Sequence, residues 1–227
     1  MSLQSFGVIG LAVMGENLAL NVERNGFPIA VYNRTRTKTD NFMATRAQGK
    51  KVKATYSIEE FCAALETPRK ILIMVQAGKP VDLVIQELKP FLSPGDVIID
   101  GGNSLFEDTD RRTAELENSG LTFIGMGVSG GEEGALNGPS MMPGGTETAY
   151  RNLEPILTKI AAQVDDGPCV TYIGKGGAGH YVKMVHNGIE YGMMQSYAEG
   201  LDLIAHGTYA GQLDLPTVTT IWQQGSL

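Results

Sequence analysis

The stretch GVIGLAVMGENLALN, residues 7–21, decides the fold of this chain. A short apolar run ends at its first motif residue, and an amphipathic pattern follows over residues 14–25. Gly10, Ala12 and Gly15 occupy the three small positions of G-x-G-x-x-G, with alanine at the second. In such a turn the first position permits a tight bend, the second admits a pyrophosphate, and the third lets helix and strand pack closely. The pattern predicts a strand, a phosphate-binding loop and a helix, although a tight turn that binds nothing has the same local spacing.

Apolar runs alternate with amphipathic segments along most of the chain. Strands separated by helices of this length form a parallel sheet that is covered on both faces. The predicted fold class is therefore α/β, with a doubly wound, mainly parallel (Rossmann-like) sheet. The expected strands cover residues 6–10, 28–33, 51–57, 70–75, 96–102, 121–129 and 170–174. The expected helices cover residues 14–25, a segment ending near 47, a segment from a capping box at Ser57 and Glu60 to 65, then 80–92, a segment before 121, and 147–162.

A much longer helix is predicted from residue 179 to about residue 205. It exceeds the length of a routine crossover between strands, and we interpret it as the first helix of an all-α domain. The predicted organisation is a Rossmann-like domain at residues 1–176, followed by the start of a helical domain at residues 177–227.

The end of the second expected strand bears on the choice of dinucleotide. Proteins that bind NAD usually place Asp or Glu there to accept a hydrogen bond from the ribose 2′-hydroxyl. This chain has Asn33, Arg34 and Thr35 instead. A guanidinium can pair with a 2′-phosphate through two hydrogen bonds, whereas a carboxylate would repel it. These residues therefore favour NADP as the cofactor. The alternative interpretation is that Arg34 is a solvated surface residue that binds no phosphate.

Two more strand ends are expected to border the same crevice, because ligands bind at the carboxyl ends of the strands in open α/β sheets. Val75, Gln76 and Ala77 follow one strand, and Asn103 follows the next. These residues are predicted to surround the nicotinamide half of the cofactor, and Asn103 could contact both cofactor and substrate. Asn103 is also a common turn former, which is the alternative interpretation.

One face of the long helix carries an unusual set of polar groups. Lys183, His186, Asn187, Glu190 and Tyr191 are spaced i, i+3, i+4, i+7 and i+8. An amine and a carboxyl group two turns apart, about 10 Å along the axis, would suit a small extended substrate lying along the helix. An amphipathic helix with a solvated polar face is the alternative.

Composition excludes several classes of protein. The net charge of −7 disfavours nonspecific binding to nucleic acid or anionic lipid, and the chain has no apolar run long enough to span a membrane. No signal segment is recognisable, and Cys62 and Cys169 have neither metal-ligand spacing nor a disulfide framework. We expect a cytoplasmic protein with buried thiols, no metal ion, no nucleic acid and no membrane partner.

Six segments together resemble the family of decarboxylating, NADP-dependent 6-phosphogluconate dehydrogenases. They are GLAVMGENLALN, YNRT, ETPRKILIMV, IDGGNS, GVSGGEEGALNGPSMMPGG and GHYVKMVHNGIEYGMMQ. The resemblance implies oxidation and decarboxylation of 6-phosphogluconate to ribulose 5-phosphate and CO₂, with reduction of NADP to NADPH. It also implies a cytoplasmic homodimer that serves the pentose phosphate pathway and gluconate utilization.

The resemblance carries roles to individual residues. Lys183 matches the general base that takes the C3 hydroxyl proton, and Glu190 matches the general acid that protonates C1. The expected substrate contacts are Asn103, Ser129, Gly130, Gly131, His186, Asn187 and Tyr191. The expected cofactor contacts are Gly10, Leu11, Ala12, Val13, Met14, Gly15, Asn33, Arg34, Thr35, Val75, Gln76, Ala77 and Asn103. A lysine base must be neutral to accept a proton, which burial or neighbouring cations favour.

Family members continue well beyond 227 residues into a helical domain that forms the dimer and supplies groups for the substrate phosphate. A chain of this length is therefore expected to turn over poorly. Two other functions remain open at this point: a non-decarboxylating 3-hydroxyacid dehydrogenase, and a non-catalytic NADP-binding module. The Glu190 acid argues against the first, because simple alcohol oxidation needs no second proton donor.

Overall fold

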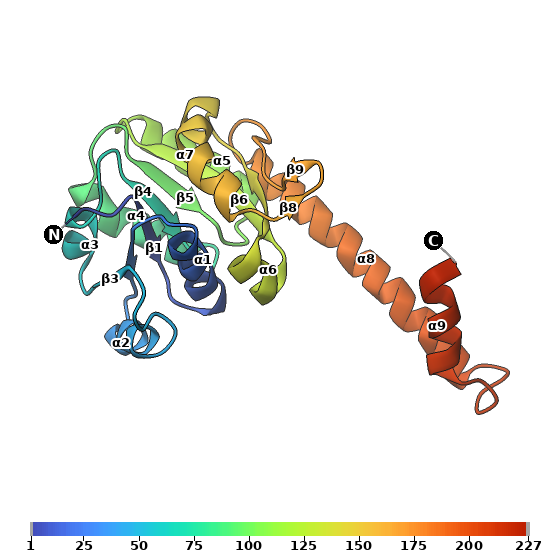
Figure 1. The fold of residues 1–227 in the computed structure, drawn as a ribbon. Helices are drawn as coiled ribbons and strands as arrows, with labels where there is room; N and C mark the ends of the chain where they lie inside the picture. Colours follow the sequence, from blue (N-terminus) through green and yellow to red (C-terminus); the bar gives the residue numbers. More distant parts are fainter. Residues whose placement is uncertain (1, 226–227) are drawn as a thin grey trace. The chain divides into compact units, whose positions relative to one another are not determined.

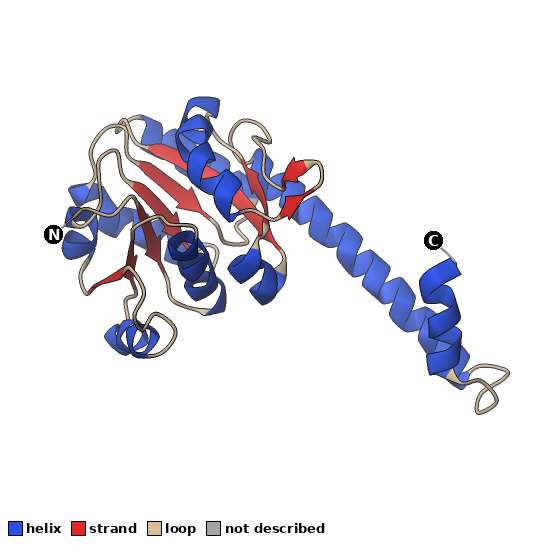
Figure 2. Ribbon diagram, in the orientation of Figure 1, coloured by secondary structure: helices blue, strands red, loops and turns tan. Residues whose placement is uncertain are grey.

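A computed structural model describes residues 2–225, which fall into two compact units, Met1–Met184 and Val185–Leu227 (Figures 1 and 2). The strands are β1 (Phe6–Ile9), β2 (Ile29–Tyr32), β3 (Val52–Thr55), β4 (Lys70–Ile73), β5 (Val97–Asp100), β6 (Thr122–Ser129), β7 (Ser140–Pro143), β8 (Gln163–Val164) and β9 (Gly167–Pro168). The helices are α1 (Val13–Arg24), α2 (Arg36–Ala44), α3 (Ile58–Ala63), α4 (Lys79–Leu88), the 3₁₀ helix η1 (Lys89–Phe91), α5 (Phe106–Glu117), α6 (Gly131–Asn137), α7 (Glu147–Ile160), α8 (Ala178–His206) and α9 (Leu215–Gly225).

The first unit is built on one seven-stranded sheet with the order β3-β2-β1-β4-β5-β6-β7. Neighbouring strands from β3 to β6 are parallel, and β7 joins antiparallel to β6, with Val128 opposite Met141. The order reverses between β1 and β4, so the connections leave in opposite directions there and open a crevice at the carboxyl ends of the strands. The predicted α/β fold with a mainly parallel sheet is confirmed.

Side chains on alternate positions of each strand enter two separate cores. On β5, Val97 and Ile99 join the core beneath α1, α2, α6 and α7, whereas Ile98 joins the core beneath α3, α4 and α5. Figure 1 shows these two groups of helices on opposite faces of the sheet. Burial on both faces explains why the central strands are continuously apolar rather than alternating.

Local signals set several helix ends as expected. Gly26 has φ +89°, a value that favours glycine, and it follows the last turn of α1. The Ser57 hydroxyl accepts a hydrogen bond from the Glu60 amide at 3.0 Å, which confirms the cap of α3. The Glu60 carboxylate accepts from the amide of Tyr56 at 2.8 Å, one residue before the position that a capping box uses.

The strand predicted at residues 170–174 is wrong. Only single bridges form there, between Val170 and Met141 and between Gly174 and Gly144. Pro143 lies in the matching part of β7 and has no N–H to donate, so a regular ladder cannot continue past it. Sequence patterns also gave no sign of α6, β7 or the small β8–β9 hairpin, and the helix predicted at 80–92 ends at Leu88 before η1.

The long helix is confirmed, because α8 runs without interruption from Ala178 to His206, against an expected 179–205. Residues from Val185 onward, with α9, make up the second unit. Large apolar side chains are exposed there, including Ile189 at 60% and Trp222 at 48%. Within the part of the chain that the structure describes, no helix is long and apolar enough to cross a membrane.

Both cysteines are free thiols. Burial raises the pKa of the Cys62 thiol to about 11, so this side chain stays protonated and unreactive near neutral pH. Cys169, which was expected to be buried, is only partly so.

Asn21 connects α1 to the neighbouring helices α6 and α7. Its side chain is fully buried, and the amide nitrogen donates to the carbonyls of Ala135 at 3.2 Å and Ile160 at 2.8 Å. Its own oxygen accepts from the side chain of Asn25 at 2.8 Å. Because buried carbonyls are costly to leave without donors, this asparagine is a structural requirement of the packing between α1 and α6.

We therefore expect Asn21→Ala to lower the free energy of unfolding by about 2–3 kcal/mol, since two buried carbonyls lose their donor. Asn152→Ala removes the same side chain from an exposed position of α7 and should change stability by less than about 0.5 kcal/mol. Urea titration followed by circular dichroism measures both. Equal effects of the two substitutions would contradict the role given to Asn21.

Candidate functional site

The phosphate loop between β1 and α1 depends on two close backbone contacts. Gly10 has φ +100°, and a Cβ atom there would collide with the carbonyl oxygen of Met74. A Cβ atom on Gly15 would collide with the carbonyl oxygen of Gly10. Only residues without a side chain fit these two positions, as the motif predicted.

Asn33 holds the loop from the end of β2. Its side-chain oxygen accepts a hydrogen bond from the Leu11 amide at 3.0 Å, and its nitrogen donates to the Thr35 carbonyl at 3.1 Å. Leu11 itself packs into the core, so the loop presents backbone rather than side chain at this position. The Asn33 amide group is thus committed to shaping the loop, and the N terminus of α1 has no side-chain cap among the described residues.

A cavity of about 280 Å³ lies beside this loop at the carboxyl ends of β1, β2 and β4. Six of the predicted cofactor residues line it: Gly10, Asn33, Arg34, Thr35, Val75 and Gln76. Seven further residues complete the lining: Ile9, Tyr32, Lys38, Pro80, Leu83, Val84 and Glu87. Leu11, Ala12, Val13, Met14, Gly15, Ala77 and Asn103 are not part of that lining.

Two cations and one acid give this cavity its charge. Arg34 and Lys38 are both exposed, Arg34 directly after β2 and Lys38 in the first turn of α2. Burial raises the pKa of the Tyr32 phenol, and Glu87 acts in the same direction whereas Arg34 opposes it. Lys38 was not predicted as a site residue, although a helix that starts right after Thr35 must bring its first turn to the same sheet edge.

Lys183 and Asn103 form the second part of the candidate site. Lys183 Nζ donates to the Asn103 side-chain oxygen at 2.6 Å, although 80 residues separate the two in sequence. The lysine is 8% exposed, and Asn103 follows the carboxyl end of β5. The structure thereby joins two residues that the sequence analysis had placed on separate elements.

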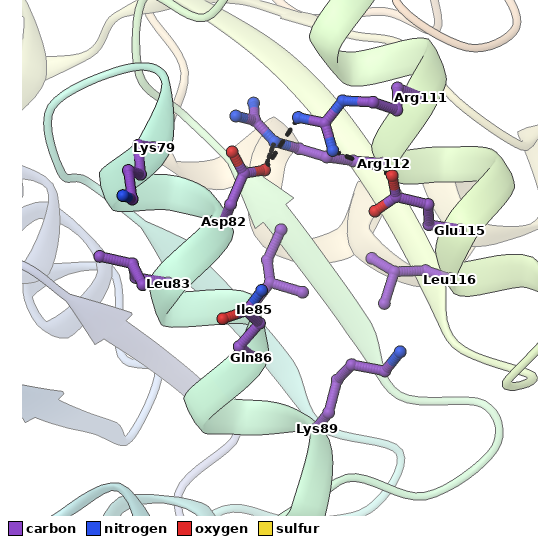
Figure 3. A pocket seen from close by; sticks show the side chains of 10 residues that line it. All are labelled: Lys79, Asp82, Leu83, Ile85, Gln86, Lys89, Arg111, Arg112, Glu115 and Leu116. Atoms are coloured by element: carbon purple, nitrogen blue, oxygen red, sulfur yellow. Dashed lines mark hydrogen bonds and ion pairs between the residues drawn. The ribbon is translucent and has the colours of Figure 1, made fainter.

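A second cavity, of about 500 Å³, lies between α4 and α5 and contains none of the predicted site residues in its described lining (Figure 3). Asp82 accepts hydrogen bonds there from Arg112 Nε at 2.7 Å and from Arg111 Nη2 at 3.0 Å. The hydrogen bond from Arg112 is the main cause that lowers the pKa of Asp82, and Arg111 adds to it against the opposing effect of burial. This carboxylate therefore balances a guanidinium that is itself only 1% exposed.

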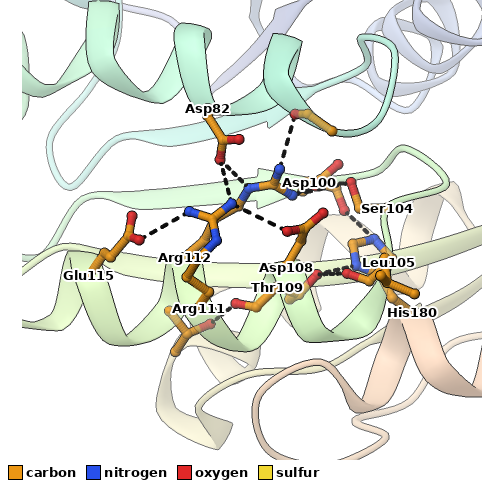
Figure 4. Close-up of polar contacts among 12 residues, drawn as sticks. Asp82, Asp100, Ser104, Leu105, Asp108, Thr109, Arg111, Arg112, Glu115 and His180 are labelled. Atoms are coloured by element: carbon orange, nitrogen blue, oxygen red, sulfur yellow. Dashed lines mark hydrogen bonds and ion pairs between the residues drawn. The ribbon is translucent and has the colours of Figure 1, made fainter.

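Arg112 leads from that cavity to a buried network at the end of β5 (Figure 4). Its Nη1 lies 3.5 Å from Asp100 Oδ2, and both side chains are buried. Asp100 also accepts from the Ser104 hydroxyl at 2.6 Å and from the Gly102 amide at 3.0 Å. The carboxylate thereby fixes the turn that carries Asn103. An acid that ends the apolar run DVIID was the sequence signal for this network.

His180 belongs to the same network, three residues before Lys183 on α8. Its Nδ1 lies 2.7 Å from the Thr109 hydroxyl, and its Nε2 lies 3.1 Å from the Asp100 carbonyl oxygen. Burial lowers the pKa of His180; Arg112 and Lys183 also lower it, and Asp100 opposes them. The imidazole is accordingly neutral near pH 7.

The predicted substrate residues Ser129, Gly130 and Gly131 lie where β6 ends and α6 begins. Gly130 has φ +131° and Gly131 has φ +60°, so both adopt backbone conformations that favour glycine. The loop is therefore a tight turn that exposes backbone amides at the start of a short helix.

The second unit contains the other predicted residues, all on α8. His186 Nδ1 lies 3.5 Å from Glu190 Oε2 and 3.3 Å from the Asn187 side-chain oxygen. Tyr191 is 69% exposed. These residues thus form one polar cluster on the helix surface. No group of three or more His, Cys, Asp or Glu side chains in the described range 2–225 is arranged to hold a metal ion.

Comparison with known proteins assigns the family. The model of the NAD binding domain of 6-phosphogluconate dehydrogenase matches residues 5–174. The model of the C-terminal domain of 6-phosphogluconate dehydrogenase matches residues 179–227. The chain belongs to the 6-phosphogluconate dehydrogenase family.

Individual relatives agree. A decarboxylating 6-phosphogluconate dehydrogenase of Synechococcus elongatus is 66% identical over 224 residues, which is 99% of this chain and 48% of that protein. An NADP(+)-dependent, decarboxylating member from Bacillus subtilis is 56% identical over 227 residues, covering all of this chain and 48% of that one. The structure of 6-phosphogluconate dehydrogenase from Plasmodium falciparum superimposes with a TM-score of 0.91 at 43% identity, over 97% of this chain and 48% of the other. The chain spans about half the length of the curated relatives it matches.

The Asp82 contacts predict a specific dependence of stability on pH. Asp82→Asn should lower the free energy of unfolding at pH 7 by about 1–2 kcal/mol, because the buried Arg112 loses a charged partner. The folded-state pKa of Asp82 is lowered, so its contribution is complete above the ordinary aspartate pKa of about 3.9 and is lost as the pH falls through the folded value.

Chemical denaturation between pH 3 and pH 8 measures this difference, which should be constant above about pH 5 and shrink below about pH 4. Asp108→Asn is the control, because Asp108 pairs with the exposed Arg111 alone and should cost less than about 0.5 kcal/mol. A difference for Asp82 that grows toward low pH would refute the assignment.

Proposed function

We propose that this chain is the cofactor-binding part, with one wall of the catalytic centre, of an NADP-dependent enzyme that oxidatively decarboxylates 6-phosphogluconate to ribulose 5-phosphate and CO₂. The observation that carries the proposal is the 2.6 Å contact between the buried amine of Lys183 and Asn103 at the carboxyl end of β5. That edge of the sheet also holds the phosphate loop, so a proton acceptor and a dinucleotide site belong to the same unit.

The proposed chemistry assigns one proton transfer to each of two side chains. Lys183, in its neutral form, would take the proton from the C3 hydroxyl, and NADP, when bound, would accept the C3 hydride. The resulting 3-keto acid would lose CO₂ as its carbonyl oxygen accepts the electron pair and the protonated Lys183 returns its proton to that oxygen, which leaves an enediol. Glu190 would then donate a proton to C1 while Lys183 takes back the enediol hydroxyl proton, and ribulose 5-phosphate would result. Both side chains belong to the uninterrupted helix α8, seven residues apart.

Charge in the cavity beside β2 supports NADP as the cofactor. Arg34 and Lys38 can both approach a ribose 2′-phosphate, and the position where NAD-binding proteins carry an acid is occupied by Asn33. Gly10 to Gly15 would hold the pyrophosphate through backbone amides, and Val75, Gln76 and Ala77 would border the nicotinamide half. Asn33 would act mainly through the loop that it holds in shape.

The remaining assignments follow from family membership. Ser129, Gly130 and Gly131 would bind the carboxyl end of the substrate, with Asn103, His186, Asn187 and Tyr191 as further contacts. We propose residues 1–176 as the NADP-binding domain and residues 177–227 as the start of the helical domain of a homodimer. The reaction would belong to the cytoplasmic pentose phosphate pathway, and 6-phosphogluconate would be its substrate, without nucleic acid or membrane partners.

A non-decarboxylating 3-hydroxyacid dehydrogenase is the alternative enzyme. Such an enzyme needs the proton acceptor and the dinucleotide site but has no use for a second proton donor. Glu190 and its His186 contact on α8 therefore favour decarboxylation. Measuring CO₂ together with NADPH separates the two reactions.

Arg34→Ala should weaken NADP binding by about 10- to 100-fold, equivalent to about 1.5–3 kcal/mol, because the 2′-phosphate loses a charge-assisted contact. NAD affinity should change by less than about twofold. Calorimetric titration of the chain with each dinucleotide measures this. Arg36→Ala is the matched control, since Arg36 is exposed and already contacts Asp40 and Tyr56. Equal losses for NADP and NAD would contradict the proposed contact.

A full-length version of the protein should release CO₂ and NADPH in equal amounts from 6-phosphogluconate. Lys183→Met should lower both by about 10³-fold or more, because no other group takes the C3 proton. Glu190→Gln should slow overall turnover by about 10²-fold while sparing hydride transfer, which single-turnover absorbance of NADPH measures. Lys175→Met, at an exposed position before α8, is the control and should be unaffected. Normal NADPH formation by Lys183→Met would overturn the assigned role.

A further inference from the structure

His180 joins α8 to two other elements through both of its ring nitrogens. Nε2 lies 3.1 Å from the carbonyl oxygen of Asp100 on β5, and Nδ1 lies 2.7 Å from the hydroxyl of Thr109 on α5 (Figure 4). The side chain is 3% exposed. These contacts belong to the first turn of α8, immediately before the turn that carries Lys183.

The partners determine the tautomer of this histidine. A carbonyl oxygen only accepts, so Nε2 carries the proton and donates to Asp100. Nδ1 is then the acceptor for the Thr109 hydroxyl proton. A neutral ring, as burial requires, satisfies both contacts with one donor and one acceptor.

Two glycines of β6 allow the start of α8, residues 178–184, to lie directly against the sheet. A Cβ atom on Gly125 would lie 2.8 Å from His180 Nδ1, and one on Gly127 would lie 2.7 Å from Lys183 Cγ. Both distances are shorter than packed atoms tolerate. The His180 ring and the Lys183 stem therefore occupy the space that two missing side chains leave on this strand.

Asp100 holds the turn that carries Asn103, the residue that accepts the hydrogen bond from Lys183. Its carboxylate accepts from the Gly102 amide at 3.0 Å and from the Ser104 hydroxyl at 2.6 Å, and Asn103 lies between these two residues. One buried residue thus fixes the asparagine through its side chain and the first turn of α8 through its carbonyl group.

We propose that His180 is a positioning residue of the reaction: by linking α8 to Asp100 and Thr109, it sets the distance between the Lys183 amine and Asn103. The role in turnover rests on the proposed function, whereas the placement of the lysine is a property of the chain itself. Since a displacement of about 1 Å at a reacting group can cost about 100-fold in rate, loss of this link should reduce turnover without removing any group that contacts the substrate.

Two substitutions separate the contacts of the ring. The Nε2 amide of His180→Gln reproduces the donor to Asp100, whereas the oxygen of His180→Asn reproduces only the acceptor for Thr109. In a full-length version, His180→Asn should lower kcat with 6-phosphogluconate by about 10- to 100-fold. His180→Gln should retain kcat within about fivefold. The Kd for NADP should stay within about twofold in both variants, since the phosphate loop lies on other elements.

A second pair tests the link from the α5 side, and would remain available if a change at position 180 prevented folding. Thr109→Val removes the hydroxyl with little change of shape, and Thr109→Ser keeps it. Thr109→Val should lower kcat by about three- to fivefold at unchanged NADP affinity, the same loss as His180→Gln, because both variants lose the contact between residues 109 and 180 and keep the one to Asp100; Thr109→Ser should stay near the wild-type rate.

Nitrogen-15 NMR of the 227-residue chain tests placement without turnover. The His180 ring should show its proton on Nε2, and the Asn103 side-chain amide resonances should move in His180→Asn and not in His180→Gln.

If kcat fell only in proportion to the fraction of protein that binds NADP, or if both variants at position 180 had wild-type kcat, the proposal would be overturned. A ring proton on Nδ1, or unmoved Asn103 resonances in His180→Asn, would also overturn it. A wild-type full-length protein that leaves 6-phosphogluconate unchanged would sink the proposed function alone, and the NMR result would still decide the placement.

Discussion

A buried carboxylate must be compensated, and the way Asp100 is compensated organises the edge of the sheet that carries Asn103. Its side chain is fully buried at the end of β5, where a lone negative charge would be expensive. A guanidinium, a hydroxyl and a backbone amide surround it, from Arg112, Ser104 and Gly102. Each of these partners comes from a segment that must then stay in place. The turn before α5 and the helix α5 itself are therefore fixed by one charge, and the backbone carbonyl of the same residue holds the entry to α8 through His180.

The requirement for small residues is the second constraint on this edge. Gly10 and Gly15 let β1, β4 and α1 approach closely at the phosphate loop, and Gly125 and Gly127 let the start of α8, residues 178–184, approach β6. Each added Cβ atom would force apart elements that the hydrogen bonds hold together. The hydrogen bonds and the glycines therefore stabilise the same contacts between elements. Short hydrogen bonds between two elements require their backbones to come close, and glycine permits that approach.

Most of the fold could be predicted from residues close together in sequence. The alternation of apolar runs with helices, the glycine spacing at residues 10–15 and the cap at Ser57 each act over one or two turns, and all were recovered. The strand expected at residues 170–174 failed because the obstacle, Pro143, lies on a different segment that the pattern could not identify as its neighbour. Lys183 and Asn103 were each predicted from local patterns as site residues. Their contact could not be predicted, because the two residues are 80 positions apart in sequence and meet only when the sheet is assembled. Lys38 and His180 were missed for a related reason, since a lone lysine or histidine is informative only once its surroundings are known.

The cofactor loop and the proposed substrate loop are also connected through the body of the domain. α1 begins at the phosphate loop, and Asn21 near its other end donates to carbonyls at the ends of α6 and α7. Arg24 adds contacts to the Leu136 carbonyl at 2.8 Å and to the Asn137 side chain at 2.9 Å. α6 begins in turn at the loop that contains Gly130 and Gly131. Because a helix of this length is stiff, a change in the position of α1 on the sheet must be accompanied by a change in α6 or by the loss of these buried hydrogen bonds. Two loops that are more than a hundred residues apart in sequence are thereby held in a fixed relation before any ligand binds, which lowers the conformational cost of binding both.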